Sequence, residues 1–317
     1  MNAATPLQIL LVQPRGFCAG VTRAIDIVEH ALRRYGAPVY VFHEIVHNQH
    51  VVAALRAKGT VFVDHLEQVP AGAVTVFSAH GVSRAVVDQA GQRALHTLDA
   101  TCPLVTKVHQ QMRKFHQQGH RLVMVGHVRH EEVEGTVGSV DAPVAVVGSV
   151  ADVGQLPWDR DTAVAYVTQT TLSLDDTRDI LAALRARYPA IVGPDLDDIC
   201  YATQNRQNAV RELATQVDLM LIVGARNSSN STRLREVAER CGCPAHLIQD
   251  ASGLDPAWWG GAVRRIGISS GASTPEVLVD QVVHHLVAQT GAKVQSLDGV
   301  REHVVFRLPK ELQGVSA

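Results

Sequence analysis

The sequence predicts an α/β fold made of several small units with mostly parallel sheets. Short apolar runs typical of strands alternate almost throughout with segments whose apolar residues have helical spacing. Aromatic residues make up only 4% of the 317 residues, so the core consists mainly of Val, Ala, Ile and Leu, which suits buried parallel strands. Polar loops follow the predicted strands repeatedly, and open α/β sheets bind ligands at that edge.

Cys102 shows the pattern around which the chain is organised. A predicted strand, His96–Ala100, runs into Thr-Cys-Pro, and a helix is predicted over 104–118. Pro103 suits the first helical turn because its missing N–H would have no partner there in any case. Cys102 is therefore expected beside a helix N-terminus, where the helix dipole favours a thiolate.

Two further cysteines repeat this setting. Cys18 follows the apolar run Ile9–Val12 and precedes a helix that is predicted to end near residue 34, and Cys200 lies ahead of a helix predicted from about residue 205 to 216. A single buried cysteine is commonly a core residue, but three in matching polar turns favour metal ligation. Thiolates gathered from three units could hold zinc or an iron–sulfur cluster. Three thiolates on a four-iron cluster would leave one iron open to substrate.

The spacing of these cysteines predicts the division of the chain. They lie 84 and 98 residues apart, and each interval is an ordinary size for one α/β unit. We therefore predict three α/β units, at 7–98, 99–196 and 197–298, and a C-terminal tail over 299–317 that carries one strand at His303–Leu308.

The composition argues against several classes of protein. The net charge of −2 gives no electrostatic basis for binding nucleic acid or an anionic membrane. The sequence has no signal-peptide pattern, and no apolar run approaches the length of a membrane-spanning helix. Five cysteines, an odd number, favour reduced thiols in the cytoplasm over a disulfide framework. The Cys241-Gly-Cys243 pair stands alone, and we interpret it as structural.

Three histidines, His47, His80 and His130, each follow a predicted strand in a loop with Gly, Asn or Ser nearby. A single loop histidine is more often solvated or locally bonded. Three at equivalent places are better explained as donors around an anion or as proton carriers. His43 and His127 lie in the same loops, and spacing alone does not choose between them.

The segment Asn227–Ser231 directly precedes a predicted helix. One such residue is enough to cap a helix, so the surplus hydroxyls and amides favour a phosphate cradle without lysine. Ser273–Glu276 fits a capping box and a ligand contact equally well. The sequence contains no Walker lysine loop and no G-x-G-x-x-G motif, which disfavours nucleotide and dinucleotide binding.

Acidic residues follow His130 at Glu132 and Glu134. In a closed, water-poor centre a carboxyl group would have a raised pKa and could donate a proton near neutral pH. The alternative is an exposed acidic loop, and the residues alone barely separate the two.

Eight ordered motifs stand out along the chain: Pro14–Val21, His43–Asn48, Phe77–Ser83, Asp99–His109, Glu132–Gly135, Thr168–Ser173, Asp198–Thr203 and Asn227–Ser231. Together they resemble the motifs of the 4-hydroxy-3-methylbut-2-enyl diphosphate reductase family, and the resemblance runs from about residue 8 to about residue 312.

The resemblance implies a trefoil of three similar small α/β domains with mostly parallel sheets around a central [4Fe–4S] cluster. Cys18, Cys102 and Cys200 match the cluster ligands, which leaves one iron without a protein ligand. The implied reaction uses two electrons and two protons to remove the allylic hydroxyl of the substrate as water. It yields isopentenyl diphosphate and dimethylallyl diphosphate, in the last step of the methylerythritol phosphate pathway. The implied electron donor is of the ferredoxin or flavodoxin type.

Other residues match functional positions of the family. Glu132 matches the proton donor, and Thr170 and Thr171 match residues near the substrate hydroxyl. The matches to diphosphate contacts are His47, His80, His130, Ser228, Ser229, Asn230 and Ser273. The sequence departs from the family pattern at Glu131, where the family usually has proline, and at Gln204, where it usually has threonine.

Two rival hypotheses from other classes remain on the residues alone. One is a zinc-dependent hydrolase that acts on a diphosphate-bearing small molecule, with Cys and His ligands and Glu132 as the base. The other is a diphosphate-binding protein whose cysteines are merely buried. Iron and acid-labile sulfide are expected only for the reductase.

Overall fold

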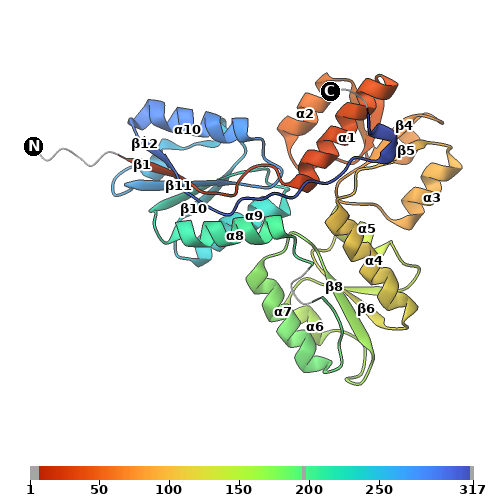
Figure 1. Ribbon diagram of the computed structural model, residues 1–317. Coiled ribbons are helices and arrows are strands. Elements are labelled where there is room, and N and C mark those ends of the chain that lie inside the picture. Colours follow the sequence, from red (N-terminus) through yellow and green to blue (C-terminus); the bar gives the residue numbers. More distant parts are fainter. Residues whose placement is uncertain (1–6, 195–197, 315–317) are drawn as a thin grey trace, which may run out of the picture. The chain divides into compact units, whose positions relative to one another are not determined.

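The computed structural model describes residues 7–194 and 198–314 (Figure 1). It contains three sheets, and every strand pair in the described residues is parallel. The predicted α/β class with small parallel sheets is therefore confirmed. The chain forms two compact units: a first unit with residues 1–18, 47–49 and 201–304, and a second unit with residues 19–46, 50–200 and 305–317.

The first unit holds a five-stranded sheet in the order β10-β9-β11-β1-β12. The N-terminal strand lies inside this sheet between β11 and β12, with Leu10 in register with Gly267 on one side and Gln295 on the other. The strands are β1 (Gln8–Leu11), β9 (Leu219–Val223), β10 (Ala245–Ile248), β11 (Arg265–Ser270) and β12 (Lys293–Ser296).

Helices cover both faces of this sheet, as Figure 1 shows for α8 (Tyr201–Ala214), α9 (Ser229–Arg240) and α10 (Glu276–Thr290). Successive residues of β1 point to opposite faces. Ile9 and Leu11 pack against the buried side of α10, whereas Leu10 belongs to the core beneath α8 and α9. Burial on both faces explains why β1 and β9 consist almost entirely of apolar residues.

The second unit contains two smaller sheets, in the orders β3-β2-β4-β5 and β7-β6-β8. The four-stranded sheet consists of β2 (Val39–Phe42), β3 (Thr60–Val63), β4 (Val74–Phe77) and β5 (His96–Asp99). The three-stranded sheet consists of β6 (Arg121–Val125), β7 (Val144–Val147) and β8 (Val164–Thr168).

The remaining helices are α1 (Ala19–Tyr35), α2 (Gln49–Ala57), α3 (Arg84–Gln92), α4 (Pro103–Gln117), α5 (Glu131–Val137), α6 (Val150–Gly154) and α7 (Leu174–Arg187). In β6, Val123 packs in the core with α6 and α7, and Met124 packs in the core with α4 and α5. The three-stranded sheet is thus covered on both faces as well.

The helices predicted after the three cysteines are confirmed, with shifted starts. Helix α1 begins one residue after Cys18, and α4 begins at Pro103, one residue after Cys102. Helix α8 begins directly after Cys200, four residues before the predicted start. Each cysteine therefore lies at a helix N-terminus, as the sequence indicated.

The strand predicted at His303–Leu308 is wrong, because those residues have no strand conformation. Val305 in this segment is 87% exposed, so the apolar pattern does not face a core. The C-terminal strand is instead β12, ten residues earlier, whose side chains are all exposed and carry no strand pattern.

The predicted division at 7–98, 99–196 and 197–298 remains a prediction, and its boundary at 196–197 lies outside the described residues. The pairing of β1 with β11 and β12 nevertheless assigns residues 8–11 to the sheet of the C-terminal strands, away from the unit at 7–98.

Among the described residues, none of the helices has the length and apolar character that crossing a membrane requires.

Candidate functional site

The residues singled out from the sequence fall into two sets, one in each compact unit. Those in the first unit are Cys18, His47, Ser228, Ser229, Asn230 and Ser273. Those in the second unit are His80, Cys102, His130, Glu132, Thr170, Thr171 and Cys200. Apart from Cys200, which lies between α7 and α8, these residues lie in the loops or first helical turns that follow parallel strands, the edge where α/β sheets bind ligands.

The loop that carries Cys18 is fixed to the first unit by its backbone. The amide of Cys18 donates to the Ala272 carbonyl over 3.2 Å, and the amide of Gly16 donates to Ser270 Oγ over 2.8 Å. Gly16 has φ of 73°, and a Cβ there would lie 3.3 Å from Glu276 Oε2. This position requires glycine because the left-handed conformation and the close carboxylate both disfavour a side chain.

The serine and asparagine residues surround the N-terminus of α9. Ser228 caps the helix: its hydroxyl accepts from the Ser231 amide over 3.3 Å. The buried Asn230 accepts from the Ala272 amide over 2.9 Å, one residue before Ser273. The positive end of the helix dipole makes this a natural place for a phosphate.

Ser273 does not form the capping box that the sequence allowed. Its hydroxyl donates to the carbonyl of His47 over 3.1 Å, and Thr274 donates to the carbonyl of Val223. Helix α10 has Pro275 as its N-cap and no side-chain cap. Ser273 therefore connects the loop after β11 with His47, so both residues belong to the same cluster.

In the second unit, Cys102 lies beside the His80 loop. Cys102 is the N-cap residue of α4, makes no side-chain capping bond, and donates its amide to the Ala79 carbonyl over 3.0 Å. The His80 and His130 rings lie 6.0 Å apart and perpendicular. His80 Nδ1 also lies 2.7 Å from Glu131 Oε2, an ion pair when the imidazole is protonated.

His130 caps α5 with its side chain. Its Nδ1 accepts a hydrogen bond from the Glu132 amide over 3.1 Å. Because Nδ1 is the acceptor, the ring proton of the neutral imidazole resides on Nε2. That nitrogen can donate to an anion, which agrees with the expected role of His130.

Glu132 is 2% exposed and is held by Thr170. Its Oε1 accepts from the Thr170 amide over 2.6 Å, and its Oε2 lies 3.0 Å from the Thr170 hydroxyl. The carbonyl of Thr170 in turn accepts from the Cys200 amide over 3.1 Å. One threonine thus joins the buried carboxylate to a cysteine loop.

Sequence reasoning missed two buried polar residues of this set. Gln169 is fully buried, accepts from the His127 amide over 3.1 Å and donates to Thr171 Oγ1 over 2.9 Å. The side chain of Asp198 is likewise inaccessible and accepts from the Thr168 amide over 3.3 Å. The sequence did carry a signal for each of them: Gln169 directly follows a strand, and Asp198 lies two residues before Cys200.

The cysteines of the turns fit the ligand set of an iron–sulfur cluster. All five cysteines lie in the described residues, and none is in a disulfide. Cys18, Cys102 and Cys200 are half-buried and lie directly before the helices α1, α4 and α8, so their thiols are not closed off in the core. Cys243, by contrast, lies in the core, and burial raises the pKa of its thiol, which agrees with a structural role.

Comparison with known sequences identifies close relatives over almost the whole chain. The LytB protein family matches residues 9–287. A 4-hydroxy-3-methylbut-2-enyl diphosphate reductase of Azoarcus sp. (strain BH72) is 58% identical over 306 residues, 96% of this chain and 98% of that protein. The enzyme of the same name from Zymomonas mobilis subsp. mobilis is 55% identical over 311 residues, 98% of this chain and 91% of the relative.

Solved structures give the same result. The E-1-hydroxy-2-methyl-but-2-enyl-4-diphosphate reductase of Plasmodium falciparum superposes with a TM-score of 0.94 at 36% identity, over 97% of both chains. A second structure, of an (E)-4-hydroxy-3-methyl-but-2-enyl diphosphate reductase, superposes with a TM-score of 0.63 at 31% identity, over 89% of this chain and 99% of that one.

Proposed function

The chain belongs to the LytB protein family, and two reductases are 55–58% identical to it over nearly its full length; we infer that it is a 4-hydroxy-3-methylbut-2-enyl diphosphate reductase. It converts 4-hydroxy-3-methylbut-2-enyl diphosphate to isopentenyl diphosphate and dimethylallyl diphosphate in the methylerythritol phosphate pathway. Two electrons and two protons enter, and the allylic hydroxyl leaves as water. The observation that carries the chemical assignment is the buried Glu132 carboxyl, joined through Thr170 to the loop of Cys200.

Cys18, Cys102 and Cys200 are the residues that would hold a [4Fe–4S] cluster in this chain. Their half-buried thiols at helix N-termini support this assignment. When bound, such a cluster supplies the electrons for the reduction.

Glu132 is the proposed proton donor. A protonated Glu132 can donate to the Thr170 hydroxyl, and the ionised carboxylate can accept from it, because a hydroxyl serves as donor or acceptor. The pair therefore suits both states of the carboxyl group. Delivery of the proton makes the departing group water rather than hydroxide, a much better leaving group. Thr171, whose hydroxyl accepts a hydrogen bond from Gln169 over 2.9 Å, is proposed with Thr170 as a contact to the substrate hydroxyl.

The diphosphate contacts proposed from the first unit are His47, Ser228, Ser229, Asn230 and Ser273, and those from the second unit are His80 and His130. Support comes from the helix N-terminus at Ser228 and from the Nε2–H of His130. A ferredoxin- or flavodoxin-type electron donor and a cytoplasmic location also remain proposals.

The test of the mechanism uses Glu132→Gln with Glu134→Gln as the matched control, because Glu134 is an exposed carboxylate on the same helix. Glu132→Gln keeps the side-chain shape but removes the transferable proton. We expect turnover with an artificial low-potential electron donor to fall by about a hundredfold or more, with diphosphate binding largely retained. Glu134→Gln should have the activity of the parent. Equal turnover in Glu132→Gln would remove this residue from the mechanism.

The test of the cofactor measures iron and acid-labile sulfide in anaerobically purified chain. We expect about four of each per chain and a brown colour that Cys102→Ser bleaches. A colourless protein that contains zinc and hydrolyses a diphosphate would instead establish the hydrolase. Full retention of the chromophore by Cys102→Ser would refute the ligand assignment.

A further inference from the structure

Each helix that follows one of the three cysteines carries a cation that bonds to the loop in front of another cysteine. The cations are Arg23, Lys107 and Arg206, five or six residues after Cys18, Cys102 and Cys200. Their partners lie one or two residues before a cysteine, at Thr101, Asp198 and Gly16.

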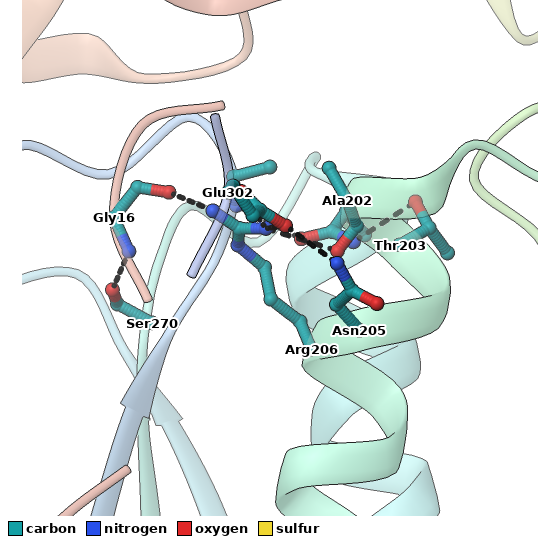
Figure 2. Close-up of polar contacts among 9 residues, drawn as sticks. Gly16, Ala202, Thr203, Asn205, Arg206, Ser270 and Glu302 are labelled. Atoms are coloured by element: carbon teal, nitrogen blue, oxygen red, sulfur yellow. Dashed lines mark hydrogen bonds and ion pairs between the residues drawn. The ribbon is translucent and has the colours of Figure 1, made fainter. Parts of the chain in front are cut away.

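Arg206 makes the strongest of these links (Figure 2). Its side chain is buried, and Nη2 donates to the Gly16 carbonyl over 2.8 Å. Nη1 donates to the Ala202 carbonyl over 3.0 Å and to both oxygens of Glu302 over 3.0 and 3.2 Å. Asn205 donates to the same carboxylate over 3.1 Å. A buried charge is tolerated only when it is paired and hydrogen-bonded in this way.

Arg23 makes the corresponding link from α1. Its Nη1 donates to the carbonyl of Thr101 over 3.0 Å, and its Nε donates to the carbonyl of Arg307 over 2.8 Å. Burial lowers the pKa of the Arg23 guanidinium, while Asp99 and Cys102 oppose that shift because their negative charges favour the cation. Thus Arg23, like Arg206, bonds to both a cysteine loop and the C-terminal segment.

Lys107 completes the set from α4. Its Nζ lies 3.7 Å from Oδ1 of Asp198, whose side chain is inaccessible to solvent. Gln111, one helical turn further along, has its side-chain amide 2.6 Å from the same oxygen, and the amide orientation that satisfies both groups turns its nitrogen to this carboxylate as a donor. The helix that begins after Cys102 is therefore tied by charge and hydrogen bonds to the loop of Cys200.

In sequence terms the three links form a closed cycle. The helix after the first cysteine binds the loop of the second, the helix after the second binds the loop of the third, and the helix after the third binds the loop of the first. We propose that Arg23, Lys107 and Arg206 are positioning residues that set the geometry of the three cysteines. The proposal rests on the proposed function, since it concerns ligands of the cluster.

Groups that fix metal ligands without touching the metal typically change metal affinity by about ten- to a hundredfold when removed. The experiment therefore compares the parent with Arg206→Met, Arg206→Lys, Arg23→Met and Lys107→Met after anaerobic reconstitution. The measurements are iron and sulfide per folded chain, the electron paramagnetic resonance spectrum of the reduced sample, and the rate of iron loss to a chelator. We expect the Met variants to lose iron about tenfold faster or more, with an altered spectrum. We expect Arg206→Lys to recover part of the difference because it keeps the charge.

Arg187→Met is the matched control. Arg187 also bridges two backbone carbonyls, of Gly154 and Leu156, but in a region without a cysteine. We expect it to lower the thermal midpoint and leave the iron content and spectrum unchanged. Should Arg206→Met fail to fold, Lys107→Met decides, because Lys107 is half-exposed and its removal opens no cavity in the core.

The outcomes separate the two proposals. A parent chain that binds no iron would overturn the proposed cofactor and with it this inference. A parent with a normal cluster, and folded Met variants with the same spectrum and the same rate of iron loss, would overturn this inference alone. An equal effect of Arg187→Met would show that general destabilisation, rather than positioning, governs iron retention.

Discussion

His109 is a buried histidine that supports the loop of His80. It lies on α4 and is 7% exposed, and a Cβ on Gly81 would lie 3.1 Å from its Cε1. Burial lowers the pKa of His109 to about 4, with a further contribution from Arg113 that Asp99 opposes. A bulkier residue than glycine at position 81 would therefore push this ring away from the loop.

This pKa predicts how stability depends on pH. The unfolded chain takes up a proton at His109 near pH 6.5, whereas the native chain takes it up only near pH 4. The contribution of neutral His109 to the free energy of unfolding is therefore fully present above about pH 6.5 and is lost as the pH falls toward 4. We expect this residue to lower the free energy of unfolding by about 2 kcal/mol between pH 7 and pH 5.

The measurement is urea unfolding at both pH values for the parent, His109→Gln and His116→Gln. His116 is exposed on the same helix, so its replacement should leave the pH dependence intact. His109→Gln should be less stable at pH 7 but should lose about 2 kcal/mol less on acidification. An undiminished pH dependence in His109→Gln would show that another group is responsible.

At the scale of elements, the N-terminus of α5 carries Glu131 at the position where the family resemblance implies a proline. Glu131 occupies the first helical position, where an acidic residue suits the helix dipole as well as proline suits its geometry. The substitution therefore costs the helix little. It does, however, place a carboxylate 2.7 Å from His80, one of the proposed diphosphate contacts.

We predict that Glu131→Gln tightens the binding of inorganic diphosphate at pH 6. The substitution removes a negative charge that lies 2.7 Å from His80 and therefore close to the proposed anion site. The expected gain is about three- to tenfold at low salt and smaller at high salt, because exposed charges are screened. The measurement is the inhibition constant of inorganic diphosphate as a competitive inhibitor of substrate turnover, for the parent and for Glu131→Gln. Weaker binding in Glu131→Gln would mean that the carboxylate orients His80 rather than repels the anion.

The elements next to the cysteines could be predicted from the sequence because their signals are local. Pro103 and the polar turns mark where α1, α4 and α8 begin, within four residues. The strand β12 could not be predicted, since its four side chains are exposed and only its pairing with β1 makes it a strand. The strand predicted at His303–Leu308 was wrong for the converse reason: Val304 and Val305 are apolar, but this segment pairs with no strand and both side chains are exposed.

The same distinction holds for the candidate site. Cysteine, histidine and glutamate carry reactive groups, so Cys102, His130 and Glu132 could be named as candidates by residue type. The family resemblance then selected His130 and Glu132 among their neighbours. Arg206 and Asp198 could not, because an arginine in a helix and an aspartate in a loop are ordinary surface residues in most sequences. Their burial depends on partners more than ninety residues away, Glu302 and Lys107.

For the whole molecule, the pairing of β1 is the feature with the largest consequence. This strand opens the described chain, yet both of its neighbours come from the last sixty residues. The five-stranded sheet can therefore form only when the C-terminal strands are present, whereas α1, directly after Cys18, belongs to the other compact unit. Adjacent residues on the two sides of Cys18 should then differ in stability.

Native-state hydrogen exchange tests this division. We expect the amides of β1 to open together with those of β9 and β11 as denaturant is added, and independently of β2 and β4. Ile268→Ala removes a fully buried side chain from β11 and should cost about 2–5 kcal/mol. The lost protection should appear at Leu10 and Leu11 but not in β4. The matched control, Val76→Ala, truncates an equally buried residue of β4 and should show the opposite pattern. If Ile268→Ala lowered protection equally in β1 and β4, the two compact units would unfold together, and this prediction would be wrong.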